Sequence, residues 1–236
     1  MRFAMRLKVL MISTIFMVGF GFVSVAQCAI QAMASRVIYD GANKAATLGL
    51  KNNANQAYMI QAWVEPGTFN QDDVVPFVVT PPLIKIESQK EATLRFIYAG
   101  QGLPTDRESQ FWISIQEIPP KPSQENILQL AIRSKIKLFY RPTQINISLE
   151  DAVKNLKWYV KDQSLYLENN SPLHVTIGDL KLNDQTTFVK YMNQDMVEPY
   201  SKIEVLKEIK FPLKKLEFTY INEFGGNKIM PLVYLK

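Results

Sequence analysis

The chain has 236 residues, of which 47% are hydrophobic and 21% charged, a balance typical of globular proteins with a substantial buried core. Its formal net charge is +5, and removal of Arg2, Arg6 and Lys8 with an amino-terminal leader lowers that charge to +2. So small a charge on an exported chain gives no support to nucleic-acid binding, and the length favours two domains.

The amino terminus has the pattern of a secretory signal peptide. Three cations precede an uncharged apolar run at residues 9–25, and small residues follow where a peptidase cuts. A transmembrane anchor is the competing interpretation, but the run is short for a bilayer. Lipid attachment to Cys28 would need a small residue before it, where Gln27 stands. We therefore expect residues 1–29 to form a leader that is cut between residues 26 and 29.

Short runs of β-branched and aromatic residues recur along the mature chain, separated by turn signals, as in β-sandwiches. In the first half we expect strands at residues 36–39, 46–51, 59–64, 93–98, 111–116 and 127–140. In the second half we expect a short helix at 149–156 and strands at 164–168, 175–180, 216–220 and 229–235. The sequence thus predicts an all-β chain of two sandwiches, residues 30–143 and 144–236.

The segment 127–140 has the clearest alternation in the chain. Its odd positions include Gln129, Arg133 and Lys135. Its apolar even positions are Leu128, Leu130, Ile132, Ile136, Leu138 and Tyr140. A period of two over this length indicates a half-buried strand, and taken alone it favours an apolar face that belongs to the strand's own core.

Residues for catalysis or metal binding are scarce. His174 is the single histidine, which argues against Ser-His-Asp or Cys-His nucleophiles and against zinc or copper sites; we expect it to be packed or at the surface. The ten glycines include no nucleotide-binding spacing. With Cys28 removed there is also no disulfide framework, so stability must come from packed cores and paired strands. We therefore expect a protein that is not an enzyme and needs no cofactor or metal.

Seven segments coincide with one known family, in the family's order. They are 36–41 (RVIYDG), 61–63 (QAW), 80–82 (TPP), 106–112 (DRESQFW), 117–120 (EIPP), 135–142 (KIKLFYRP) and 220–226 (YINEFGG). On these segments, which span nearly the whole mature chain, the sequence resembles the periplasmic pilus-assembly chaperones of the chaperone–usher pathway. The resemblance implies two immunoglobulin-like β-sandwich domains arranged as a boomerang, with an interdomain cleft that holds a pilus subunit.

The same resemblance implies that the chaperone lends the subunit a missing strand. A subunit that lacks one strand of its sandwich exposes an apolar groove and unpaired sheet edges, and a donated strand covers both. The strand in position to do this is 127–137, so Leu128, Leu130 and Ile132 are the side chains expected to enter the subunit. For these three residues the resemblance overrides the core interpretation.

Two groups of charged residues also carry over from the family. Arg36 and Lys137 match the pair that binds the subunit's terminal carboxylate. Lys137 has the opposite parity to the donated residues, which requires either a bulge in the strand or a side chain that reaches around its edge. Glu108, Arg141 and Glu223 match an interdomain ion cluster, with Glu223 standing where the family usually has Asp.

The resemblance implies a transient 1:1 complex with pilus subunits, delivery to an outer-membrane usher, and no nucleic acid. It leaves open whether the free protein caps itself as a homodimer. It also suggests a cis bond at Thr80-Pro81, and the eight residues 119–126 match the short-loop subgroup associated with rod-like pili. The main alternative is a secreted carbohydrate-binding or adhesion module with Trp63, Trp112 and Trp158 as its platform, although apolar neighbours favour a core position for each. A hydrolase is a more distant alternative.

Overall fold

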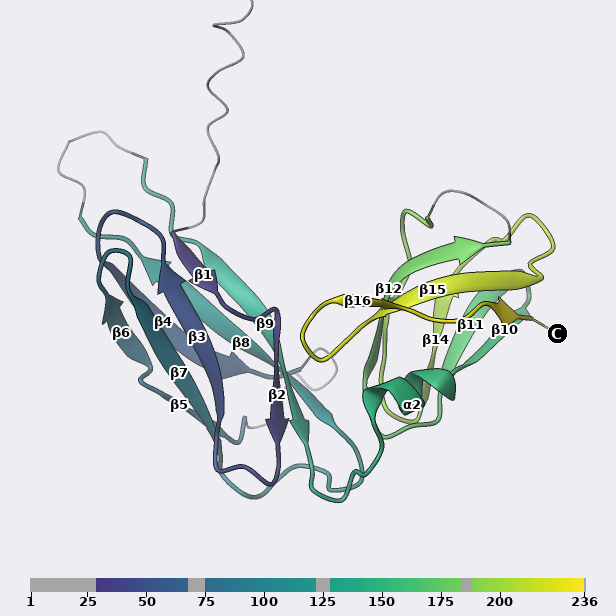
Figure 1. Cartoon of the computed structure of the whole chain (residues 1–236), viewed down its shortest axis with the longest axis horizontal. Helices are drawn as coiled ribbons and strands as arrows, with labels where there is room; N and C mark the ends of the chain where they lie inside the picture. Colours follow the sequence, from purple (N-terminus) through teal and green to yellow (C-terminus); the bar gives the residue numbers. More distant parts are fainter. Residues whose placement is uncertain (1–28, 68–74, 122–127, 184–187, 236) are drawn as a thin grey trace, which may run out of the picture.

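The structure is a computed structural model that describes residues 29–67, 75–121, 128–183 and 188–235. Within these ranges two β-sandwiches meet at an angle, which gives the boomerang outline of Figure 1. The predicted all-β fold is confirmed. Apart from Ala29, the predicted leader lies outside the described residues. In the part of the chain that is described, no helix is long and apolar enough to span a bilayer.

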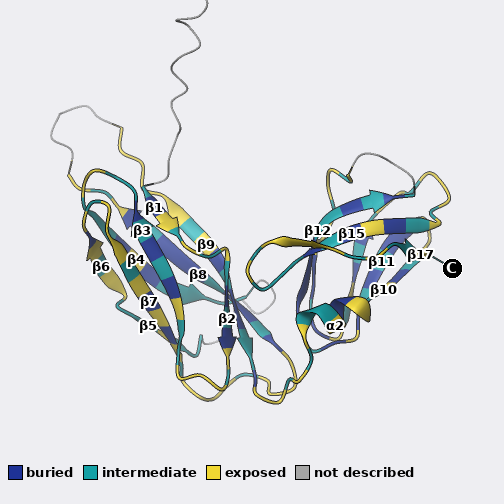
Figure 2. Ribbon diagram, viewed as in Figure 1, coloured by how far each residue is buried: buried dark blue, intermediate teal, exposed yellow. Residues whose placement is uncertain are grey.

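The first sandwich packs two sheets face to face, with strand orders β1-β3-β7-β5 and β2-β9-β8-β4-β6. Alternate residues point inward, so Leu48, Phe96, Ile113 and Leu138 are fully buried in one core between the sheets (Figure 2). The strands are β1 (Ile30–Ala32), β2 (Arg36–Asp40), β3 (Ala46–Asn52), β4 (Tyr58–Glu65), β5 (Phe77–Thr80), β6 (Leu83–Ile86), β7 (Glu91–Tyr98), β8 (Ser109–Ile118) and β9 (Arg133–Arg141).

The amino-terminal segment of this domain pairs with both sheets. β1 is antiparallel to β3, whereas β2 runs parallel to β9, so the chain crosses between the sheets in the three residues after Ala32. β2 accompanies only residues 137–141 of β9. Among the described residues, the edge of β9 that precedes Lys137 therefore has no neighbouring strand on this side.

The second sandwich begins after a connection at residues 142–148. Ser148 caps the short helix α2 (Leu149–Lys154) by accepting a hydrogen bond from the Asp151 amide at 3.1 Å. One sheet has the order β10-β11-β14, and the other has β13-β12-β15-β16 with β17 also paired to β15. The strands are β10 (Lys157–Lys161), β11 (Ser164–Asn169), β12 (Val175–Leu182), β13 (Met196–Val197), β14 (Ser201–Leu206), β15 (Lys215–Ile221), β16 (Asn227–Ile229) and β17 (Val233–Tyr234).

Two of the predicted strands are wrong in extent. In the described part of the segment 127–140 the strand begins at Arg133, and residues 128–132 are not part of it; residue 127 lies outside the described residues. The predicted strand 229–235 is divided into β16 and β17, with Pro231 between them. The other predicted strands and the helix agree with the structure to within two residues at each end. The Thr80–Pro81 bond is cis, as the resemblance suggested.

Candidate functional site

The segment before β9 presents a row of exposed apolar side chains. Leu128 is 84% exposed, Leu130 72% and Ile132 43%. They have the same parity as Ile136 and Leu138, which are buried in the core of the first sandwich. The apolar row thus begins inside the sandwich and continues beyond it, with exposure that rises from Ile132 to Leu128. Large apolar side chains lined up in this way are typical of a surface that meets a partner.

The edge of β9 beside this row can accept another strand. β8 pairs with β9 from Arg133 to Tyr140 on one side, and β2 occupies the other side only from Lys137. Residues 133–136 therefore have free backbone groups on the β2 side among the described residues. An open edge next to an apolar row is the arrangement that strand addition requires.

Arg36 and Lys137 stand side by side where this open edge ends. They are direct partners in the parallel ladder of β2 and β9. Their neighbours Val37 and Leu138 point into the core, so both cations project from the opposite face of the sheet. That face looks toward the second domain, because Phe139 on the same sheet packs against His174 with ring centroids 5.3 Å apart. The pair therefore lies in the cleft between the domains.

This arrangement resolves the parity of Lys137. The ladder between β8 and β9 has one continuous register from Arg133 to Tyr140, so the bulge explanation is wrong for this stretch. Lys137 points from the outer face, over the Trp112 ring at 5.8 Å, while the apolar row follows the core parity. Within β9 the apolar side chains of Ile136 and Leu138 thus lie on the core face and Lys137 on the other.

Both cations are held in partly desolvated surroundings. Burial lowers the pKa of Arg36, with Glu108 acting in the opposite direction. Burial also lowers the pKa of Lys137, where Asp195 opposes the effect and Arg36 adds to it. Arg36 Nη1 donates to the Ile221 carbonyl at 3.4 Å, and its buried Nε has no hydrogen-bond partner among the described residues. Two adjacent cations with unused donors form a site for an anion.

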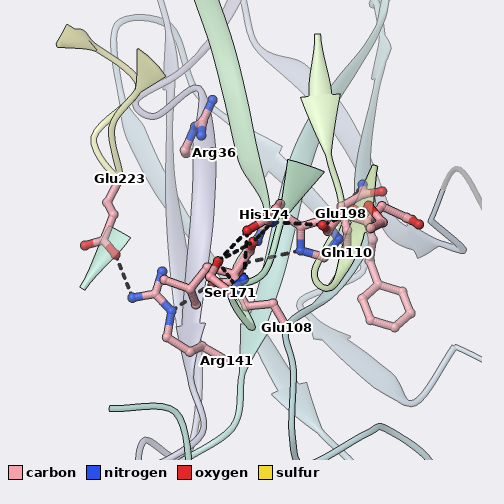
Figure 3. Close-up of polar contacts among 12 residues, drawn as sticks. Arg36, Glu108, Gln110, Arg141, Ser171, His174, Glu198 and Glu223 are labelled. Atoms are coloured by element: carbon pink, nitrogen blue, oxygen red, sulfur yellow. Dashed lines mark hydrogen bonds and ion pairs between the residues drawn. The ribbon is translucent and has the colours of Figure 1, made fainter. Parts of the chain in front are cut away.

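A second cluster of charges joins the domains (Figure 3). Arg141 donates through Nε to Glu108 at 2.8 Å and through Nη1 to Glu223 at 2.6 Å. Burial alone would lower the pKa of Arg141, but the two carboxylates raise it overall. The other Glu108 oxygen accepts the His174 backbone amide at 2.9 Å and lies 3.3 Å from the His174 ring. The cluster ties β9 to the second domain next to the cationic pair.

The loop that carries His174 is itself fixed by a buried asparagine. Asn169 donates to the carbonyls of Leu173 and Glu198 at 2.7 and 2.8 Å. Its side-chain oxygen accepts both the amide and the hydroxyl of Ser171. The single histidine is thus a packed interface residue, as the sequence suggested, and its bond to Glu108 is a role that the sequence did not reveal.

The three tryptophans do not form one platform. Trp158 lies in the second core against Phe218, as predicted. Trp63 and Trp112 lie on the outer face of the first domain, so their predicted core positions are wrong. Trp63 donates to Glu65 at 2.9 Å and stacks with Arg133 at 4.9 Å. The two half-buried rings thus contact cations on the face that bears Lys137.

Comparison with known proteins places both domains of the chain in one family of chaperones. Residues 29–146 match the family of pili and flagellar-assembly chaperones, PapD N-terminal domain, and residues 151–230 match the pili assembly chaperone PapD, C-terminal domain. Chaperone protein HifB of Haemophilus influenzae is 33% identical over 205 residues, covering 82% of this chain and 83% of its own. The probable fimbrial chaperone YadV of Escherichia coli K12 is 35% identical over 212 residues, covering 81% and 84%.

Solved structures agree with this result. The crystal structure of YadV superposes with a TM-score of 0.73 at 33% identity, covering 88% of this chain and 100% of that one. The Salmonella enterica SafB chaperone, solved in complex with SafA pilin, gives a TM-score of 0.77 at 26% identity over 90% and 99% of the two chains.

Together with these relatives, the two-sandwich fold defines the chain as a periplasmic pilus-assembly chaperone, a class of non-enzymatic proteins, and does not favour a carbohydrate-binding module. The chain belongs to the PapD family of pilus-assembly chaperones of the chaperone–usher pathway.

Proposed function

We propose that this chaperone binds an incomplete pilus subunit along the open edge of β9, with Leu128, Leu130 and Ile132 filling the subunit's apolar groove. The observation that carries this proposal is the exposed apolar row that leads directly into an edge without a partner strand. Full burial of an exposed leucine side chain contributes about 1.5–3 kcal/mol, and Ile132, which is less exposed, contributes less. Backbone pairing at the edge fixes the direction of the strand.

Arg36 and Lys137 hold the carboxyl terminus of that subunit. The two cations stand where β2 takes over the edge of β9, so a strand lying along residues 133–136 ends beside them. With its carboxylate at Lys137, the added strand runs parallel to β9. A charge-assisted bond in a partly desolvated cleft then sets the register, which an alternating strand alone specifies poorly.

Glu108, Arg141 and Glu223 orient the two domains and do not bind the subunit. Their contacts join β8 and β9 to the turn after β15, which supports this assignment. The outer-membrane usher receives the complex, and the extension of the next subunit replaces the donated strand. No nucleotide is required if the assembled fibre has the lower free energy. In this organisation residues 1–29 are the leader, 30–143 the strand-donating domain and 144–236 the second domain.

Capture of a subunit in the periplasm tests the proposal. The major subunit encoded with the usher is co-expressed with the chaperone and recovered by affinity purification of the chaperone. Arg36→Ala and Lys137→Ala should lose the subunit while the chaperone keeps its thermal unfolding transition. Lys85→Ala, a lysine on β6 at the far edge of the same sheet, is the matched control and should retain it. Unchanged recovery with both anchor variants would contradict the assignment.

A further inference from the structure

The turn between β15 and β16, residues 222–226, is stabilised by several hydrogen bonds between its own residues. The Asn222 side-chain oxygen accepts the amides of Phe224 and Gly226 at 2.9 and 3.0 Å. The Asn222 backbone exchanges further hydrogen bonds with Gly225 and Gly226, and Gly225 has a φ of +86° that suits glycine. The tip of this turn therefore has one backbone conformation before any partner arrives.

This turn belongs to the second domain but rests on the first (Figure 1). Glu223 bonds to Arg141, and the Ile221 carbonyl accepts from Arg36. The backbone of Gly225 packs so closely on Ser35 that a Cβ at Gly225 would lie 1.8 Å from the hydroxyl oxygen. The residues on either side of Phe224 are thus both docked on the first domain, beside the cationic pair in the cleft.

Phe224 itself is 92% exposed at the tip of this turn. The preceding aromatic residues of β15, Phe218 and Tyr220, are buried in the second core. None of the ring and cation contacts between described residues involves Phe224. A single exposed apolar side chain is ordinary on a protein surface, but this one is presented by a rigid turn beside an anion site. A fixed aromatic ring loses little conformational entropy on binding and is a common interface anchor.

We propose that Phe224 is a subunit-contacting residue that covers apolar surface beside the carboxyl-terminal strand of the bound pilus subunit. The inference rests on the proposed function, because the subunit is the partner whose carboxylate lies at Arg36. Arg36 bonds to the carbonyl of Ile221, three residues before Phe224, so the ring and the anchor share one short segment. Both domains thereby contact the end of the subunit. The first domain supplies β9 and the cations Arg36 and Lys137, and the second supplies the aromatic ring.

Site-specific photocrosslinking tests this contact in the periplasm. The photoreactive residue p-benzoylphenylalanine replaces Phe224, and the co-expressed probe is the major pilus subunit encoded with the usher. A covalent product with the combined mass of chaperone and subunit is expected. Tyr234 is the matched control position, since it is an exposed aromatic residue of the same domain that pairs with Lys215 at the other end of β15. Equal crosslinking from both positions, no product from Phe224, or a product only with the usher or a second chaperone would overturn the inference.

Two further variants separate this inference from the proposed function. The same photoreactive residue at Leu130 reports on strand donation alone: a subunit product from Leu130 without one from Phe224 refutes only the present inference, whereas no product from either refutes both. In equilibrium binding to the purified subunit lacking its extension, Phe224→Ala should weaken affinity about tenfold, whereas Tyr234→Ala and Phe224→Tyr should leave it within about twofold. An affinity of Phe224→Ala equal to that of the unaltered protein contradicts the contact.

Discussion

Replacing Glu108 by alanine should destabilise the chaperone far more than replacing Glu223, although both carboxylates bind the same arginine. The Glu108 side chain is 2% exposed and the Glu223 side chain 38%. Glu108 also accepts the His174 amide at 2.9 Å across the domain interface. Its removal therefore breaks a buried ion pair with Arg141 inside the first domain and a buried hydrogen bond to the second domain.

The size of each effect follows from this difference in burial. Breaking a buried ion pair by removing one partner costs about 3–5 kcal/mol, and leaving a buried amide without an acceptor costs about 1–3 kcal/mol. Arg141 keeps Glu223 at 2.6 Å, which compensates part of the loss, so we expect about 3 kcal/mol for Glu108→Ala. The partly exposed pair with Glu223 should be worth about 1 kcal/mol or less.

Urea unfolding at neutral pH, followed by circular dichroism, measures both values. Glu87→Ala serves as the control, because Glu87 forms an ion pair with Lys85 in which both side chains are about 60% exposed. We expect no measurable loss for that variant. A cost for Glu108→Ala equal to or below that of Glu223→Ala would refute the idea that burial gives Glu108 the larger role.

Three further variants test the site and its electrostatics. Leu130→Asp should abolish subunit capture, because a carboxylate would enter an apolar groove. The same variant should change the unfolding free energy of the free chaperone by no more than about 0.5 kcal/mol, since Leu130 is exposed. Lys137→Met should lose subunit capture and raise the melting temperature of the chaperone. Burial lowers the pKa of Lys137, which means that folding disfavours its charge at neutral pH. A lower melting temperature for this variant would contradict the prediction. Hydrogen bonds from Lys135, Ser114 and Trp63 lower the pKa of Glu65. Glu65→Gln should therefore be less stable than the unaltered protein at pH 7. The difference in unfolding free energy should shrink as the pH falls below about 4.3 and through the lowered pKa. A gap independent of pH in paired urea titrations would argue against that stabilisation.

The strands were largely predictable from the sequence because the period of two is a local property. Inward and outward side chains alternate within each strand, so β8 could be located from its own residues. The end of a strand depends instead on its neighbours. Residues 128–132 continue the alternation of β9 but are not part of the strand, which the pattern alone did not reveal.

Trp63 and Trp112 illustrate a different limit. Both stand in strands among apolar neighbours, which favoured core positions, yet parity places them on the outer face of their sheet. Alternation divides a strand into two faces but does not say which face is covered by the other sheet and which by a second domain or a partner. That choice is made when the sheets pack.

The sequence by itself determined that this protein is an all-β chain with a strongly alternating segment before residue 141, because hydrophobic alternation and turn chemistry act over a few residues. The tertiary structure decided what surrounds Lys137. The crossing of β1 and β2 between sheets leaves part of the β9 edge open, and the domain angle turns the outer face toward the cleft. Contacts such as Arg141 with Glu223, 82 residues apart, exist only after both domains have folded and met. Long-range packing, which no local pattern encodes, thus converts an amphipathic strand and two cations into a site.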